Sequence, residues 1–306
     1  MNPVYEEPVS ADFWAKSRFR HDFRASFSHM TSALGGFLLP EGYGGPRGLR
    51  ALAREGSTVV EFGRQVRRGR SDRRGLADLP YAGPHKGAAV EPVLLIPGFM
   101  AGDWTLTAMS AFLRRHGYRT YRSHIHVNVG CTREAADRLE RRLEAIASRR
   151  GRKVTIVGHS LGGMLARGLA SRRPDLVEGI VSMGSPVLAP GAVHHLLALN
   201  VEALNRLTKA GFGGLMSADC TRGECARLSF EETHAPLPED FPFTAIYSKR
   251  DGIVDWKACL DPAALQVEVS TSHCGMAVDP VVLDHVLGAL RNQRLSQTQR
   301  SKSMSA

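Results

Sequence analysis

The stretch from Lys153 to Gly163, which reads KVTIVGHSLGG, constrains the fold of this 306-residue chain more than any other. It begins with apolar, β-branched residues, as a short strand buried on both faces does. The motif G-x-S-x-G follows at Gly158–Gly162 and leads into an Ala- and Leu-rich helical pattern. A turn that takes a strand directly into a helix leaves no room for a Cβ two residues before or after its central residue. We therefore predict a strand, a tight turn and a helix, with Ser160 held at the end of a sheet and at the positive end of the helix.

Ser160 is a candidate nucleophile, although an ordinary capping serine in a glycine-rich turn would produce the same motif. A serine hydroxyl at neutral pH needs a base that takes its proton and an acid that orients the base. In chains built around this turn, the partners follow in the order Ser, Asp or Glu, His. The interpretation of Ser160 depends on whether the rest of the chain supplies them.

Strand-like and helical segments alternate over about 200 residues that begin near residue 90. The expected strands are Pro92–Phe99, Tyr118–Val127, Val154–Val157, Glu178–Met183, Phe243–Ser248 and Gln266–Ser270. The expected helices are Asp103–His116, with Trp104 on its inner face, Arg133–Arg150 and Pro280–Arg291. This alternation predicts an α/β fold, with a mostly parallel central sheet covered by helices on both faces.

The alternation breaks between residues 187 and 242. A helical pattern at Val193–Leu207, a glycine-rich patch and a proline-rich end occupy this interval. An insertion at this point predicts a helical cap above the carboxyl ends of the strands. We therefore divide the chain into an N-terminal extension at 1–89, a main domain at 90–291 with its cap at about 187–242, and a polar tail at 292–306.

The net charge of +10 lies in the flanks of the chain. Residues 1–90 hold 14 basic and 9 acidic residues, residues 91–290 hold 22 and 21, and the last 16 residues hold four basic residues and no acid. A nearly neutral main domain argues against a nucleic-acid groove. In the extension, residues 48–66 show apolar residues at helical spacing among arginines. Such a basic amphipathic helix either packs on the main domain or contacts an anionic membrane surface.

Targeting signals, cofactor motifs and metal motifs are absent from the sequence. Residues 1–30 contain no apolar signal-peptide core, so we expect a cytoplasmic protein, with membrane contact limited to its surface. Neither H-E-x-x-H nor a phosphate-binding glycine pattern occurs, and we expect no metal and no cofactor. The five cysteines include no C-x-x-C, which argues against a zinc ribbon. Cys220 and Cys225 would close a small disulfide loop in an oxidising compartment and would stay free thiols in the cytosol.

Partners for Ser160 follow the last two predicted strands. Phe243–Ser248 leads into KRDGIVDW, which contains Asp251 and, four residues later, Asp255. The next strand leads into TSHCGM, which contains His273. Because parallel strands end at one edge of a sheet, an acid and a histidine in these loops would lie on the edge where Ser160 stands. We favour Asp251 over Asp255 because it lies nearer the end of its strand.

Other histidines fit the role of base less well than His273 does. His124 and His126 flank a strand-like stretch, and His194 and His195 fall in the predicted cap. His159 lies inside the turn and is expected to pack beneath it, and His234 has the wrong position in the chain. Cys274, beside His273, is interpreted as a packed small residue in preference to a redox switch.

The motifs Pro97-Gly98-Phe99, Gly158–Gly162, Arg250–Val254 and Ser272-His273 resemble, in this order, those of lipases and esterases of the α/β-hydrolase superfamily. The resemblance covers about residues 90–290 and is strongest to bacterial lipase-like members with an inserted cap. It implies that Ser160 is the nucleophile, that Asp251 orients the base and that His273 is the base. It also implies an oxyanion hole made by the backbone N–H groups of Phe99 and Leu161. Many lipases have His-Gly where this chain has Pro97-Gly98, a change that keeps the backbone donor but removes one side-chain interaction.

The function that follows is hydrolysis of carboxylic esters through an acyl-enzyme, without a cofactor. The apolar residues of the predicted cap favour a lipid or another apolar acyl substrate. An acyltransferase or a thioesterase with the same three residues is an alternative, and a non-catalytic binding protein is a second one. The oligomeric state is not predicted.

Overall fold

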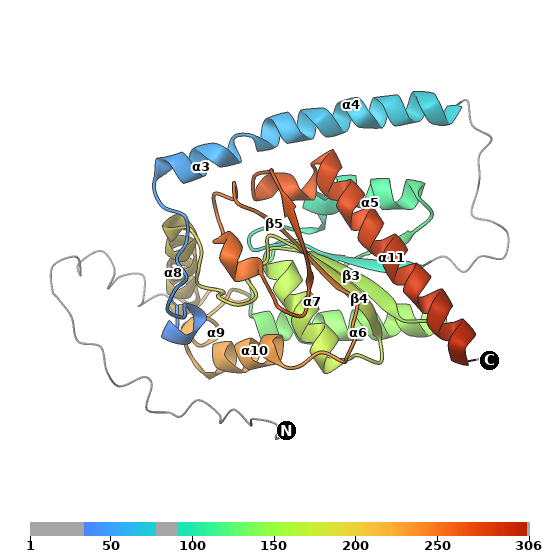
Figure 1. Cartoon of the computed structure of the whole chain (residues 1–306). Coiled ribbons are helices and arrows are strands. Elements are labelled where there is room, and N and C mark those ends of the chain that lie inside the picture. Colours follow the sequence, from blue (N-terminus) through green and yellow to red (C-terminus); the bar gives the residue numbers. More distant parts are fainter. Residues whose placement is uncertain (1–33, 78–90, 305–306) are drawn as a thin grey trace, which may run out of the picture.

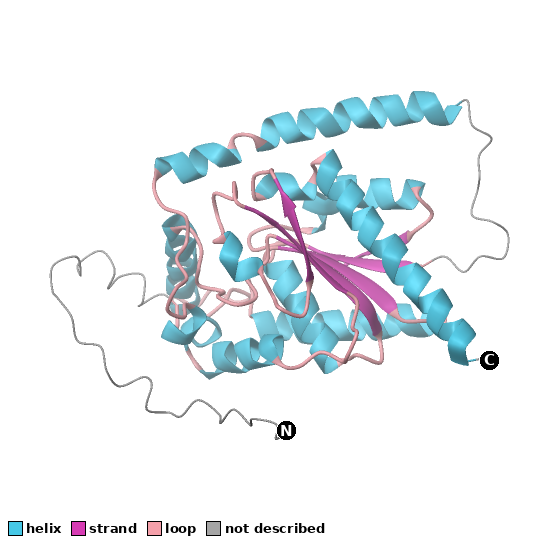
Figure 2. Ribbon diagram, viewed as in Figure 1, coloured by secondary structure: helices cyan, strands magenta, loops and turns pink. Residues whose placement is uncertain are grey.

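The structure, a computed structural model, describes residues 34–77 and 91–304. In this part, six strands form one parallel sheet in the order β2-β1-β3-β4-β5-β6 (Figures 1 and 2). The strands are β1 (Pro92–Ile96), β2 (Arg119–Arg122), β3 (Val154–His159), β4 (Val177–Met183), β5 (Phe243–Ser248) and β6 (Leu265–Val269). All the ladders are parallel, so every strand ends at the same edge. The predicted α/β class and parallel sheet are confirmed.

Helices cover both faces of the sheet, since alternate side chains of its buried strands point to opposite sides. Val93 and Leu95 of β1 pack with α5 (Thr107–Arg115) and α11 (Pro280–Met304). Leu94 and Ile96 pack on the other face with α6 (Thr132–Arg150) and α7 (Leu161–Arg172). Strands buried on both faces explain why β1 and β3 appear in the sequence as continuous apolar runs.

Three helices lie between β4 and β5, where the cap was predicted. They are α8 (His195–Lys209), α9 (Ala218–Arg222) and α10 (Glu224–His234). An ion pair buried beneath them joins Arg167 of α7 to Asp261, with Nε 3.1 Å from Oδ2. Arg167 also donates from Nη1 to the carbonyl of Ala235, just past α10 (2.9 Å). This arginine therefore ties the cap to the helix that follows Ser160.

The extension contains the 3-10 helix η2 (Gly36–Leu38) and the helices α3 (Leu49–Glu55) and α4 (Thr58–Ala77). Figure 1 shows α3 and α4 crossing the molecule on the side of β5 and α11. The sequence pattern at 48–66, expected as a single amphipathic helix, is divided between α3 and α4, and it is largely the polar side of these helices that packs on the main domain. Glu61 and Gln65 are buried, whereas Leu49, Val59, Val60, Phe62 and Val66 are exposed.

Other segments also differ from the sequence-based expectations. The predicted strand at 118–127 is confined to β2, since the chain after Arg122 leaves the sheet. The predicted helix at 103–116 begins as the 3-10 helix η3 (Asp103–Leu106), which leaves Trp104 71% exposed and not on the inner face. The last helix continues through the polar residues 292–304, a stretch without proline or glycine.

Within residues 34–77 and 91–304, no helix is both long and apolar enough to cross a bilayer.

Removal of the buried arginine is expected to destabilise the whole domain. Arg167→Ala leaves the Asp261 carboxylate buried without its counter-charge, which costs about 3–5 kcal/mol of unfolding free energy. Urea unfolding followed by circular dichroism measures the change. The control is Arg206→Ala, which breaks an exposed pair with Glu202 and is expected to cost about 0–1 kcal/mol. Equal losses in the two variants would contradict the role given to Arg167.

Candidate active site

The turn between β3 and α7 holds Ser160 in a backbone conformation that side chains rarely adopt. Its φ is 53° and its ψ is −121°. The turn is closed tightly by its glycines: a Cβ on Gly158 would lie 2.4 Å from the carbonyl carbon of Gly162, and one on Gly162 would lie 2.2 Å from the carbonyl oxygen of Ile96. The G-x-S-x-G spacing is thus required by contact between the turn and the end of β1. A strained serine held in this way is typical of an activated nucleophile.

Asp251 and His273 meet at the same edge of the sheet. His273 Nδ1 lies 2.6 Å from Asp251 Oδ2. The other oxygen of Asp251 accepts from the backbone N–H groups of Ile253 and Val254, both at 2.8 Å. Both side chains are buried. The carboxylate is therefore oriented by its own loop and presents one oxygen to the imidazole.

The protonation of His273 depends on the charges around it. Burial alone would lower the pKa of this imidazole, but the adjacent Asp251 carboxylate, with a smaller contribution from Glu55, outweighs burial and raises the pKa above its ordinary value. His159, whose Nε2 lies 3.0 Å from the His273 carbonyl oxygen, has its pKa lowered to about 4 by burial. His159 is therefore neutral at pH 7 and packs beneath the turn, as expected.

The remaining candidates for acid and base point elsewhere. Asp255 caps the short helix η4 (Trp256–Cys259) and accepts from the backbone N–H groups of Gly44 and Lys257. His194 is the N-cap of α8, and His195 begins that helix. His234 contacts the Phe230 carbonyl within α10, while His124 and His126 lie in the loop after β2.

The loop after β1 brings Phe99 to Ser160. Within the described residues, the backbone N–H groups of Phe99 and Leu161 donate to no protein acceptor, and both residues line a pocket together with Ser160. The buried Asn128 supports this loop with two hydrogen bonds. Its side-chain Nδ2 donates to the Pro97 carbonyl (3.0 Å), and its backbone carbonyl accepts from the Met100 N–H (3.0 Å). Sequence reasoning missed Asn128, because nothing in the local pattern indicates a partner 31 residues away.

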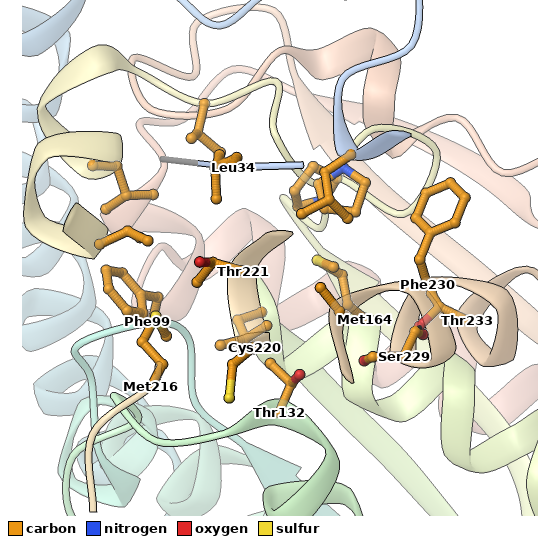
Figure 3. A pocket seen from close by; sticks show the side chains of 18 of the residues that line it. Leu34, Phe99, Thr132, Met164, Met216, Cys220, Thr221, Ser229, Phe230 and Thr233 are labelled. Atoms are coloured by element: carbon orange, nitrogen blue, oxygen red, sulfur yellow. Dashed lines mark hydrogen bonds between the residues drawn. The ribbon is translucent and has the colours of Figure 1, made fainter. Parts of the chain in front are cut away.

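The pocket in front of Ser160 is apolar and roofed by the cap (Figure 3). It encloses about 830 Å³ of empty space, its mouth included. Apolar side chains reach it from η2, α8, α10 and the segments next to them: Leu34, Leu38, Val193, Leu197, Val201, Met216, Ala226 and Phe230. Only some apolar residues of the predicted cap line this pocket. Others point to solvent, namely Leu196, Leu199, Leu207 and Phe212.

Two carboxylates of the extension hold the loops that carry Asp251 and His273. Glu55 Oε1 accepts from Gly252 N–H (2.9 Å) and His273 N–H (3.0 Å), and its Oε2 accepts from Cys274 N–H (3.0 Å). Glu61 accepts from the backbone N–H (2.9 Å) and the hydroxyl (2.5 Å) of Ser272. These contacts explain why the polar face of the extension is buried. The sequence showed no sign of them, since the partners are about 200 residues apart.

The arrangement can polarise a histidine and stabilise an imidazolium beside a strained serine. It also offers unpaired backbone donors where an oxyanion could form. In the described part of the chain no hydrogen bond joins Ser160 Oγ to His273. Such contacts are often long before substrate binds.

Comparison with known proteins shows what the chain as a whole is similar to. The sequence model of the alpha/beta hydrolase family matches residues 93–304. A curated triacylglycerol lipase of Vibrio cholerae is 32% identical over 99 residues, which are 30% of this chain and 31% of that protein. The match thus spans about a third of the relative's length.

Solved structures share the fold. The mature form of a Bacillus licheniformis lipase superposes with a TM-score of 0.52 at 15% identity, over 69% of this chain and 96% of that one. Its propeptide form gives a TM-score of 0.50 at 15% identity, over 65% of this chain and 49% of that one. At this identity the likeness supports the fold alone.

Glu55→Gln is expected to lower kcat for an ester substrate by roughly ten- to a hundredfold, because one of the two acceptor oxygens becomes an NH2 group that cannot accept from the loops that carry Asp251 and His273. It also removes a negative charge that favours protonated His273, so the acid limb of the pH–rate profile shifts to lower pH. Steady-state kinetics between pH 5 and 9 measure both effects. Glu41→Gln, the same change at an exposed site of the extension, is the control. An unchanged pH profile in Glu55→Gln would contradict the proposed positioning role.

Proposed function

This chain belongs to the alpha/beta hydrolase family, and we propose that it is a serine hydrolase of lipase or esterase type that cleaves carboxylic esters. Ser160 acts as the nucleophile, His273 as the base and Asp251 as the residue that orients His273. The observation that carries this assignment is the 2.6 Å contact between His273 and Asp251 at the sheet edge where the strained Ser160 faces an apolar pocket.

The reaction proceeds in two acyl transfers. Ser160 Oγ attacks the ester carbonyl while His273 Nε2 takes its proton, and the Asp251 carboxylate stabilises the imidazolium that forms. The N–H groups of Phe99 and Leu161 donate to the negative oxygen of the tetrahedral intermediate. His273 then protonates the departing alcohol, which leaves an acyl group on Ser160. Water, deprotonated by His273, attacks this ester, and His273 returns the proton to Ser160 Oγ as the acid leaves.

The pocket favours an apolar acyl group. Thirteen of its 19 lining residues are aliphatic, aromatic or methionine. Such a surface gains about 0.8 kcal/mol for each methylene that it removes from water. An acyltransferase would form the same acyl-enzyme but pass the acyl group to an alcohol instead of water. A thioesterase would load it from a thioester. Product analysis with competing acceptors separates these alternatives from hydrolysis.

We predict that a fluorophosphonate probe labels the wild-type protein and that Ser160→Ala abolishes the labelling. With p-nitrophenyl esters, Asp251→Asn lowers kcat by about 10³–10⁴-fold, because His273 is no longer held in the tautomer that accepts the serine proton. The matched control is Asp255→Asn, which changes the neighbouring acid of the same loop and retains activity. Octanoyl ester is expected to be cleaved with a higher kcat/KM than acetyl ester.

Failure of these experiments has distinct meanings. An unlabelled wild-type protein would favour a non-catalytic binding protein. Labelling together with a preference for acetyl ester would retain the serine hydrolase and reject the apolar acyl pocket as its specificity site. Equal losses in Asp251→Asn and Asp255→Asn would contradict the assignment of the acid.

Contact of the extension with an anionic membrane is a second proposal. Val59, Phe62 and Val66 lie exposed along α4, with side chains that are 77%, 52% and 38% accessible. Exposed arginines, Arg54, Arg64 and Arg67, lie on the same two helices. An apolar row beside basic side chains matches the interface of a membrane that carries acidic lipids.

The test is co-sedimentation with vesicles that contain phosphatidylglycerol. We expect binding at low salt that weakens at high salt, and about a tenfold loss of affinity in a Val59→Ser, Phe62→Ser double variant. Val281→Ser, which removes an exposed apolar side chain of α11, is the control. These point changes are preferable to deletion of the extension, because Glu55 and Glu61 hold the loops around His273. A wild-type protein that never sediments with the vesicles would reject the proposal.

A further inference from the structure

Three cysteines from distant parts of the chain meet at the junction between the cap and the main domain. Cys131 precedes α6, Cys220 lies in α9 and Cys225 lies in the first turn of α10. Their sulfur atoms all lie within 4.8 Å of one another, and Cys131 Sγ is 3.4 Å from Cys225 Sγ. All three are free thiols and partly buried. Of the two states that the sequence left open for Cys220 and Cys225, the structure has the free thiols.

We propose that Cys131, Cys220 and Cys225 bind a zinc ion and thereby fasten the cap to the main domain. Zinc–thiolate bonds of about 2.3 Å place tetrahedral sulfur ligands about 3.8 Å apart. One of the three sulfur pairs is separated by 3.4 Å and all three pairs lie within 4.8 Å, so shifts of about an ångström or less bring the sulfurs to this spacing. Three thiolates leave the fourth coordination position for water.

The surroundings of the sulfurs suit metal-bound thiolates better than free ones. Cys131 is the N-cap of the 19-residue α6, and Cys225 lies at the start of the 11-residue α10. The positive ends of both helices favour negative charge on sulfur. On binding, each thiol loses one proton to solvent, and a divalent ion with three thiolates carries a net charge of −1.

The site would connect elements that surround the pocket. Cys220 and Thr132, the residue next to Cys131, both line the pocket in front of Ser160 (Figure 3). Asn205 of α8 donates to Thr221 beside Cys220 (3.1 Å), and the Gly35 N–H donates to the Thr221 carbonyl (2.9 Å). An ion held by α6, α9 and α10 would therefore limit movement of the cap relative to the sheet. This site is independent of the proposed ester chemistry, since no ligand takes part in it.

Cobalt and zinc test the proposal directly. The full chain is reduced, freed of metal with a chelator and titrated anaerobically with Co²⁺, which shows thiolate charge-transfer absorption in the near ultraviolet when cysteine sulfur binds it. We expect about one Co²⁺ per chain, displaced by one Zn²⁺. Cys131→Ser, Cys220→Ser and Cys225→Ser each weaken binding at least tenfold. Cys274→Ser, at an exposed cysteine, leaves it unchanged.

A second measurement remains informative if a serine variant folds poorly. In the wild-type chain, Zn²⁺ is expected to protect these three thiols, but not Cys274, from alkylation by iodoacetamide, as read by peptide mass spectrometry. Zinc also raises the thermal midpoint by mass action. A reduced protein that takes up neither metal would overturn the proposal, as would uptake that persists in all three variants. Because the assay does not depend on turnover, an inactive hydrolase would leave the result unaffected.

Discussion

Contact between the turn at Ser160 and the end of β1 is the constraint on which the site depends. Gly162 lies so close to the Ile96 carbonyl that only glycine fits, and Gly158 lies equally close to Gly162. The same contact places Ser160 beside the loop that carries Phe99. Parallel pairing then brings the loops after β5 and β6 to this edge. Backbone packing thus positions the nucleophile and its surroundings before any side chain contributes.

The extension supplies two carboxylates, Glu55 and Glu61, that accept hydrogen bonds from the loops at this edge of the sheet. Loops at the ends of parallel strands carry backbone N–H groups that need acceptors when they are covered. Glu55 supplies acceptors for three such groups and Glu61 for a fourth. Because this demand is met from the polar side of α3 and α4, the larger apolar side chains at Leu49, Val59, Val60, Phe62 and Val66 are left facing outward. One requirement therefore explains both the buried carboxylates and the exposed apolar row.

The cap likewise serves more than one purpose. Its inner side chains form most of the apolar pocket, together with Leu34 and Leu38 of the extension. Its underside is held by Arg167 and by the cluster of three thiols. A cap joined to the sheet at several separate points favours a pocket of defined shape over a loosely attached lid. In our proposal, the metal would strengthen one of these points.

The order of strands and helices along the chain, the turn at Ser160, and the loops that carry Asp251 and His273 could be predicted from local sequence patterns. These features are local, because periodicity and glycine spacing report on neighbouring residues. The directions of the Asp251 and Asp255 side chains depend on the folded chain: Asp251 contacts His273, whereas Asp255 accepts from the Gly44 N–H. The fold of the whole chain also makes the contacts of Glu55 and Glu61 with the loop at His273 and brings Cys131, Cys220 and Cys225 together. Such contacts join residues about 90 to 220 positions apart, and no local pattern encodes which distant group will need an acceptor or a ligand.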